Sequence, residues 1–228
     1  MLTSLISIFY PRICLSCKEL LLKKEQMICS ECYHHLTFTD LHQIKENALH
    51  QLFYGRIQLV HASAILYFNK SNVTHKIIHQ LKYKGEQEIG ALLASLYETE
   101  LLSIHQNAKF DLVVPIPLHP KKLKLRGYNQ LTLFGNEISN ILKIPTEEKL
   151  LLKQKETTTQ TIKKKDDRTK MDTDIFYLNK PERFANKHIL LIDDVVTTGS
   201  TLENALISLS KIENVKLSII TMAMTDHG

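Results

Sequence analysis

The chain has 228 residues, of which 43% are hydrophobic and 23% are charged, and its formal net charge is +5. This composition is that of a soluble globular protein, and the length suffices for one α/β core with a small appendage. No stretch approaches the roughly 18 apolar residues that a membrane-spanning helix requires, so we expect no membrane span.

The basic residues are unevenly distributed and form two clusters. One consists of Lys121, Lys122, Lys124 and Arg126, and the other of Lys163, Lys164, Lys165, Arg168 and Lys170. Each cluster is either a solvated face or a contact surface for an anionic partner, such as pyrophosphate or a nucleic-acid backbone.

The first fourteen residues are apolar, but they carry no basic segment and reach Pro11 and Arg12 where a signal-peptide cleavage site would be expected. We therefore expect a short helix that packs on the body of the protein. A cleaved signal peptide is the less favoured alternative.

All four cysteines lie in two Cys-x-x-Cys pairs with eleven residues between them: Cys14, Cys17, Cys29 and Cys32. Two such turns place four thiolates around one tetrahedral zinc ion. Disulfides are the competing interpretation, but the absence of a convincing secretion signal favours a reducing compartment. We predict a structural zinc site without an open position for catalysis. We also predict a zinc-binding subdomain over residues 1–50 and a main domain over residues 51–228.

The following region alternates expected helices and strands. The spacing of apolar residues predicts a helix over 41–53, a strand over 61–68, helices over 74–83 and 89–104, and a buried strand over 110–114. Lys82, Tyr83 and Lys84 border an end of the second helix that we expect to face a ligand. Lysines at helix ends are, however, more often partners of the helix dipole.

Alternating prolines follow the second strand. Between residues 115 and 120 they exclude a helix and a central strand, so we expect a stiffened loop at the carboxyl edge of the sheet. Ligands bind at this edge in open α/β sheets. We predict that Lys121, Lys124 and Arg126 bind pyrophosphate, ahead of a helix that opens near Asn129. The alternative is a surface connection with solvated lysines.

Residues 151–176 contain three consecutive threonines and many charges, without Gly or Pro. We predict a mobile loop over 153–160 that leads into a short basic helix. Such loops often close over a site and protect a reactive intermediate from water. A disordered connection is the alternative.

A continuous apolar run from Ile189 to Ile192 predicts a buried parallel strand, which begins near Lys187 and ends abruptly in Asp193 and Asp194. A turn of small and hydroxyl residues follows, comprising Thr197, Thr198, Gly199, Ser200 and Thr201. A helix comes next, and Ser200 with Glu203 predicts a capping box at its start. Backbone N–H groups at a helix start hold a phosphate, and two carboxylates accept hydrogen bonds from vicinal hydroxyls and attract Mg²⁺. This pattern predicts a ribose 5-phosphate site. A last strand is expected over 215–222.

The acidic pair and the turn resemble the phosphoribosyl pyrophosphate (PRPP) motif of type I phosphoribosyltransferases. Over nearly its whole length the chain resembles the ComF family of competence proteins. The shared features are the cysteine pairs, LKYKG at 81–85, VPIPLHPKKLKLRGYNQ at 114–130, Gln160 with Arg168, and LLIDDVVTTGSTL at 190–202. Two departures are Lys153, where relatives usually have arginine, and Met171, where they usually have asparagine. Lysine lacks the bidentate fork of arginine, so the role of that loop toward a second substrate is in doubt.

The resemblance implies an α/β protein with the parallel-sheet type I phosphoribosyltransferase fold and a small N-terminal zinc-binding subdomain with four cysteine ligands. It implies a cytoplasmic protein that binds structural Zn²⁺, binds PRPP with Mg²⁺, and handles single-stranded DNA in natural transformation beside DNA-uptake and recombination proteins. In this reading Asp193 and Asp194 contact the ribose, and the turn at 197–201 holds the 5′-phosphate.

An active phosphoribosyltransferase, which transfers ribose 5-phosphate to a nitrogenous base, is the alternative. The chain ends shortly after the last expected strand, so we expect any base-binding hood to come from the N-terminal half. The basic loops have few aromatic residues beyond Tyr83 and Tyr128, so the sequence gives only weak support for base stacking.

Overall fold

The structure is a computed structural model that describes residues 11–69, 72–153 and 176–226. The expected N-terminal helix, the basic cluster at 163–170, and Gln160 and Met171 lie outside these residues, as does nearly all of the loop expected over 153–160. Within the described ranges, no helix is long and apolar enough to cross a membrane.

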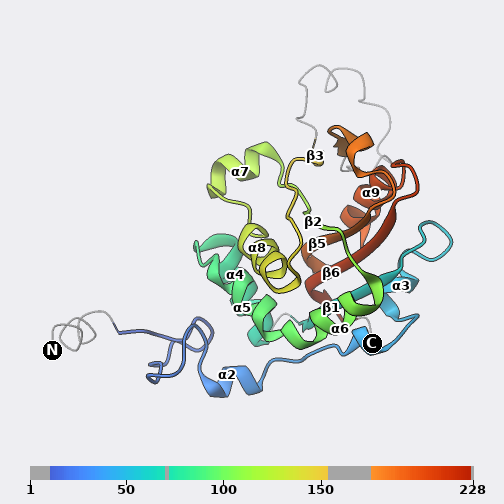
Figure 1. The fold of residues 1–228 in the computed structure, drawn as a ribbon. Helices are drawn as coiled ribbons and strands as arrows, with labels where there is room; N and C mark the ends of the chain where they lie inside the picture. Colours follow the sequence, from blue (N-terminus) through green and yellow to red (C-terminus); the bar gives the residue numbers. More distant parts are fainter. Residues whose placement is uncertain (1–10, 70–71, 154–175, 227–228) are drawn as a thin grey trace, which may run out of the picture.

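Four parallel strands form the central sheet (Figure 1). In spatial order they are β1 (His61–Phe68), β6 (Lys216–Thr225), β5 (His188–Val196) and β2 (Leu112–Pro115). The residues of β5 are buried almost throughout, as expected for a parallel strand that is covered on both faces. The α/β class and the parallel sheet predicted from the sequence are confirmed.

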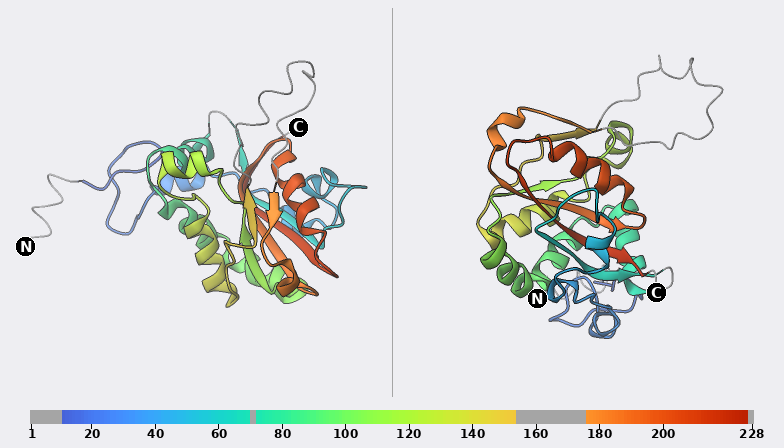
Figure 2. Two further views of the ribbon diagram at one scale, coloured as in Figure 1. Left: turned by 90° about the horizontal axis from the view of Figure 1, so that it is seen from above. Right: turned by 90° about the vertical axis from the view of Figure 1, so that its right-hand side faces the viewer.

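Helices cover both faces of the sheet (Figure 2). On one face lie α4 (Val73–Tyr83), α5 (Glu88–Leu96) and α8 (Thr132–Leu142), and on the other lie α3 (Ala48–Gln51) and α9 (Ser200–Leu209). Helices α5 and α8 approach each other so closely that a Cβ at Gly90 would lie only 3.0 Å from the backbone nitrogen of Phe134.

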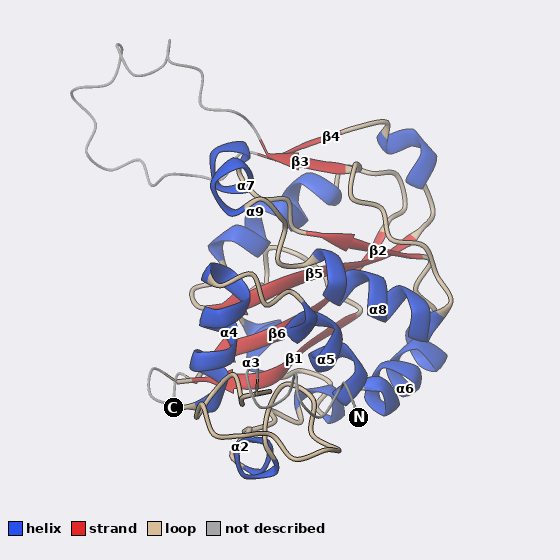
Figure 3. Cartoon of the chain, turned by 90° about the vertical axis from the view of Figure 1, so that its left-hand side faces the viewer, coloured by secondary structure: helices blue, strands red, loops and turns tan. Residues whose placement is uncertain are grey.

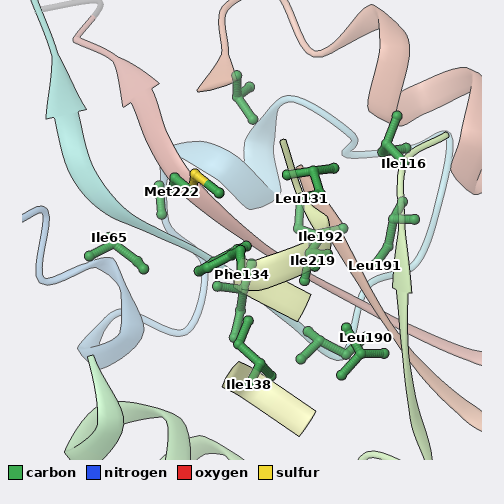
Figure 4. Packing of buried hydrophobic residues seen from close by; sticks show 14 of the residues in the cluster. Ile65, Ile116, Leu131, Phe134, Ile138, Leu190, Leu191, Ile192, Ile219 and Met222 are labelled. Atoms are coloured by element: carbon green, nitrogen blue, oxygen red, sulfur yellow. The ribbon is translucent and has the colours of Figure 1, made fainter. Parts of the chain in front are cut away.

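The buried core extends over both faces of the sheet, and Figure 4 shows part of it. Phe134 and Ile138 of α8 pack over Leu190, Ile192 and neighbouring strand residues, and all of them are fully buried. Burial of large apolar side chains is the main favourable contribution to folding. The core therefore holds the carboxyl ends of β5 and β2 in fixed positions.

Several expected elements differ from the structure. The helix expected over 89–104 is two helices, α5 and α6 (Glu98–Ala108), with Tyr97 between them. The helix expected over 41–53 is a 3₁₀ turn, η1 (Leu41–Gln43), followed by the short α3. Asn47 separates these two, because its side chain caps α3 and also donates to the carbonyl oxygen of Ala62.

The stiffened loop expected between residues 115 and 120 is followed directly by a helix, α7 (Pro120–Arg126), which the sequence did not predict because the next helix was expected near Asn129. Pro120 occupies the first turn, where its missing N–H costs no intrahelical hydrogen bond. Gly127 ends the helix with a φ of 81°.

Smaller elements complete the described chain (Figure 3). An antiparallel ribbon is formed by β3 (Leu151–Lys153) and β4 (Phe176–Leu178). A short helix, α2 (Ser30–His34), follows Cys29, and a 3₁₀ turn, η3 (Pro181–Phe184), precedes β5.

Candidate functional site

The acidic pair lies near the carboxyl end of β5, inside the strand rather than after it. The strand continues to Val196, four residues beyond its expected end, and Asp193 pairs in register with Thr221 of β6. Both aspartates are buried: 8% of Asp193 and 6% of Asp194 is exposed. Burial, reinforced by the negative charge of Asp194, raises the pKa of Asp193 to about 8.

Asp194 is held by two side chains from distant segments. The ammonium of Lys82, at the end of α4, lies 2.9 Å from one carboxylate oxygen. The Gln130 side-chain amide donates to the other oxygen at 2.7 Å. The carbonyl oxygen of that amide accepts from the Arg126 guanidinium. One chain of contacts therefore joins α4, α7 and the end of β5.

The segment after α7 is fastened to α4 by two further contacts. The Tyr128 hydroxyl donates to the carbonyl oxygen of Leu81 at 2.5 Å, and the Arg126 guanidinium lies 5.5 Å from the centre of the Tyr83 ring. Sequence reasoning did not predict a role for Gln130. The signal was present, because Gln130 closes the RGYNQ block and Lys82 lies in LKYKG, the two blocks that the structure brings together.

The turn expected to hold a phosphate lies directly after the acidic pair. Gly199 has a φ of 78°, and a Cβ there would lie 3.3 Å from the Phe53 ring. Because both the conformation and the contact disfavour a side chain, glycine is required at this position. Thr197, Thr198 and Ser200 are exposed around it, and α9 opens at Ser200.

The predicted capping box is wrong. Gly199, not Ser200, is the N-cap residue, and its conformation provides no side-chain cap. Glu203 instead pairs with the Arg56 guanidinium, which also donates to the carbonyl oxygen of Leu52. The first turn of α9 is thus anchored to the segment after α3, and its N–H groups are left without a side-chain acceptor from Ser200.

The three residues predicted to bind pyrophosphate do not converge on one point. Arg126 reaches the acidic pair through Gln130. Lys124 instead lines a cavity of about 1120 Å³, together with Lys153, Tyr177 and apolar residues after β2, but without the acidic pair. Lys121 is exposed on α7. The contacts of the described residues thus join Arg126 to the acidic pair, and pyrophosphate binding by all three residues stays a prediction.

The four cysteines form one cluster, as predicted. The sulfur atoms of Cys14, Cys17, Cys29 and Cys32 all lie within 4.8 Å of one another, and those of Cys17 and Cys29 are 3.6 Å apart. Tetrahedral Zn²⁺ with bonds of about 2.3 Å separates its sulfur ligands by about 3.8 Å. The four thiols therefore fit a zinc ion.

Hydrogen bonds within the cluster favour the thiolate form of Cys14, whereas burial raises the pKa of Cys32. The backbone N–H of Cys29 donates to the sulfur of Cys14, and that of Cys32 donates to the sulfur of Cys29. Burial raises the pKa of Cys14, but N–H groups that donate to its sulfur outweigh burial and lower it to about 6. A thiolate is the form that binds metal.

A family model described as "Phosphoribosyl transferase domain" matches residues 132–228, which include the acidic pair and the turn. Residues 132–228 are thus similar to a phosphoribosyl transferase domain. This match agrees with the observed sheet, and the predicted type I phosphoribosyltransferase fold class is confirmed.

Curated relatives bear names that refer to competence or to DNA utilization. Competence protein F of Haemophilus influenzae is 30% identical over 130 residues, which cover 55% of this chain and 57% of that protein. DNA utilization protein YhgH of Escherichia coli is 30% identical over 128 residues, which cover 55% and 56%. The chain thus spans about half the length of these two relatives.

Competence protein ComFC of Bacillus subtilis is 27% identical over 213 residues, which cover 85% of this chain and 76% of that protein. These homologues confirm the resemblance to the ComF family that the motifs predicted. Among solved structures, a purine phosphoribosyltransferase from Pyrococcus horikoshii matches with a TM-score of 0.40 and 16% identity, over 58% of this chain and 74% of that one.

Proposed function

We propose that the protein binds PRPP with Mg²⁺ and single-stranded DNA, and that it acts in DNA uptake during natural transformation. One observation carries the PRPP part of the proposal. The buried pair Asp193 and Asp194 lies near the carboxyl end of β5, and only Val195 and Val196 separate it from an exposed hydroxyl-rich turn at the start of α9. A sugar-hydroxyl acceptor and a phosphate cradle are therefore adjacent, in the order that a ribose 5-phosphate needs.

In this proposal the two carboxylates accept hydrogen bonds from the ribose 2′- and 3′-hydroxyls. Thr197, Thr198, Gly199, Ser200 and Thr201 surround the 5′-phosphate. Bound Mg²⁺ would neutralise pyrophosphate charge beside the pair. Carboxylate oxygens are the ligands that Mg²⁺ prefers, so the residues fit the ion. Lys82 and Gln130 orient Asp194, because each contacts a different oxygen of that carboxylate.

The role in DNA uptake is supported by the names of the relatives, competence protein F and ComFC. Exposed lysines on α7 offer a surface for a phosphate backbone. The proposal includes a cytoplasmic location and DNA-uptake and recombination proteins as partners, in line with a competence protein.

The structural zinc site belongs to the proposal as well. We assign it to a subdomain over residues 1–50, with the phosphoribosyltransferase-like domain over 51–228. Contacts cross this boundary, because Phe38 forms a β-bridge with Leu66 and Asn47 donates to Ala62. The subdomain is therefore attached to β1 over its last dozen or so residues.

The zinc assignment is tested by Cys14→Ser, with His34→Ala as the control, because His34 is exposed close to Cys32 and is not a proposed ligand. We expect loss of bound zinc and local unfolding near the N-terminus in the first variant, because metal binding and folding are coupled. Zinc content by elemental analysis and proteolysis of the N-terminal segment measure both. An unchanged zinc stoichiometry in Cys14→Ser would refute the assignment.

The proposed function is tested by measuring pyrophosphate release from PRPP and Mg²⁺ against a panel of nitrogenous bases, with and without single-stranded DNA. We expect the protein to bind both PRPP and DNA and to release no pyrophosphate. Release that depends on one base would instead establish an active phosphoribosyltransferase and identify its acceptor. A protein that binds neither PRPP nor DNA would refute the proposal.

A further inference from the structure

A row of rings runs along α4 from the end of β1 toward the acidic pair. The ring of Phe68 lies 5.4 Å from that of His75, which lies 6.5 Å from His79, which in turn lies 4.9 Å from Tyr83. The interplanar angles are 50°, 33° and 48°, so none of these rings meets its neighbour at a right angle. We call Phe68, His75, His79 and Tyr83 the ring ladder.

The three ladder residues of α4 are spaced by four residues, which places them on one side of the helix, about one turn apart. That side is not the core-facing one, which carries Ile77, Ile78 and Leu81. His79 is exposed and Tyr83 is 66% exposed. Phe68 and His75 are partly buried, and Phe68 packs against the core, but packing of the core does not explain the rings of His79 and Tyr83.

The surroundings of the ring ladder are cationic. Helix α4 contains no acidic residue, and Lys76 and Lys84 are exposed one position after the ladder residues His75 and Tyr83. At the far end the Arg126 guanidinium lies over the Tyr83 ring and continues the row. Arg126 ends α7, which carries three further exposed lysines.

Rings beside cations match one class of polymer. Single-stranded nucleic acids bind where bases stack on aromatic side chains and phosphates follow a positively charged groove. A duplex cannot use the rings, because its bases already stack on each other. An acidic peptide would use the lysines but gain little from four rings in a row.

We propose that the ring ladder is the surface on which this protein stacks the bases of single-stranded DNA, with Lys76, Lys84 and the α7 lysines beside its phosphates. The inference rests on the proposed function and adds the location of the DNA. It also sets an order along the surface. Because Lys82, next to Tyr83, pairs with Asp194, a strand on the ladder ends beside the predicted PRPP site.

The test is fluorescence anisotropy with a labelled oligothymidylate of about twenty nucleotides, longer than the span of one binding module, and the full-length protein. The variants are His79→Ala and the double variant His79→Ala with Tyr83→Ala. Tyr54→Ala is the matched control, because Tyr54 is 85% exposed and lies after α3, outside the ladder. We expect binding to weaken about tenfold for each ring removed, and Tyr54→Ala to bind like the wild type. Tyr83→Phe should retain binding, because it keeps the ring.

A duplex of the same length and an oligouridylate separate the modes of binding. We expect the duplex to bind weakly and equally to all variants. Because stacking does not depend on the sugar, we expect the ladder variants to lose affinity for the oligouridylate in parallel with their loss of affinity for DNA. If the wild type binds single-stranded DNA and the double variant binds it with the same affinity, the ring ladder is not the binding surface, but the proposed function still holds. No binding of single strands by the wild type would overturn both. Thermal unfolding of each variant shows that the fold is kept.

Discussion

The two edges of the central sheet shift the pKa of an aspartate in opposite directions. At the amino edge, Asp111 accepts from the backbone N–H of His188 at 2.8 Å and from the Lys187 ammonium at 3.0 Å. Burial raises the pKa of Asp111, but these donors outweigh burial and lower it below its ordinary value. At the carboxyl edge, burial and a second carboxylate raise the pKa of Asp193. At the amino edge the donors stabilise the charged form of Asp111, whereas at the carboxyl edge burial stabilises the protonated form of Asp193.

The turns at the two edges also differ, in which residues occupy the left-handed region of the backbone. At the amino edge, ordinary residues occupy the left-handed region of the backbone: Lys109, Asn186 and Asn214 have φ values between 51° and 63°. At the carboxyl edge, Gly199 occupies that region above the Phe53 ring, where a side chain would not fit. The carboxyl edge thus combines a buried acidic pair with a turn conformation that favours glycine, and both features cost stability.

The pH dependence of stability separates the two edges most strongly. Asp193 contributes stability that is fully present below its unfolded pKa of 3.8 and is lost as the pH rises toward about 8, because the folded state holds the proton more tightly. Asp111 does the reverse, and its contribution is lost as the pH falls through its lowered pKa. Asp193→Asn should therefore remove a decline of up to about 1.4 kcal/mol per pH unit between these limits.

Urea unfolding from about pH 3 to about pH 8, the range over which such carboxylates titrate, measures this difference. Asp111→Asn is the control, and it should remove only part of the acid-side loss of stability. A profile for Asp193→Asn that runs parallel to that of the wild type throughout this range would contradict the buried, protonated state of Asp193.

Loss of the basic partner should also distinguish the edges. Lys82→Met leaves Asp194 nearly buried without its cation, so we expect a loss of about 2 kcal/mol in the free energy of unfolding. Lys187→Met should lose only about 0.5 kcal/mol, because 47% of the Lys187 side chain and 36% of the Asp111 side chain are exposed. Denaturant unfolding at one pH compares the two, and equal losses would remove the distinction between the edges.

A further expected effect concerns the glycine of the turn. Gly199→Ala should cost about 1–2 kcal/mol, from the φ of 78° together with the contact to Phe53. Gly55→Ala is the matched control, because Gly55 has a φ of 72° with no atom near the added Cβ. Thermal unfolding of both variants isolates the contribution of Phe53. If Gly55→Ala costs as much as Gly199→Ala, the contact with Phe53 contributes nothing.

The sequence predicted what depends on local pattern. The apolar run of β5, the acidic pair after it and the spacing of the cysteines each occupy a few neighbouring residues, and the structure has the strand, the pair and the cluster. It missed what depends on contacts between distant segments. Glu203 has the spacing of a capping box, but Arg56, 147 residues away, pairs with it instead.

The contacts of Gln130 and the ring ladder were missed for the same reason. Gln130 and Asp194 are 64 residues apart, and no local pattern indicates that they meet. The sequence contained part of the signal for the ring ladder, because His75, His79 and Tyr83 are spaced by four residues in an expected helix and so lie on one side of it. The sequence prediction considered only aromatic residues in basic loops, and the two histidines of the ring ladder lie on a helix.

In the proposed function, the carboxyl edge of the sheet, and not the amino edge, binds PRPP. Isothermal titration of PRPP in the presence of Mg²⁺ tests it with the wild type, the double variant Asp193→Asn with Asp194→Asn, and Asp111→Asn. We predict that the double variant loses at least about a hundredfold in affinity while it stays folded, and that Asp111→Asn binds like the wild type. Unchanged affinity in the double variant would contradict the account.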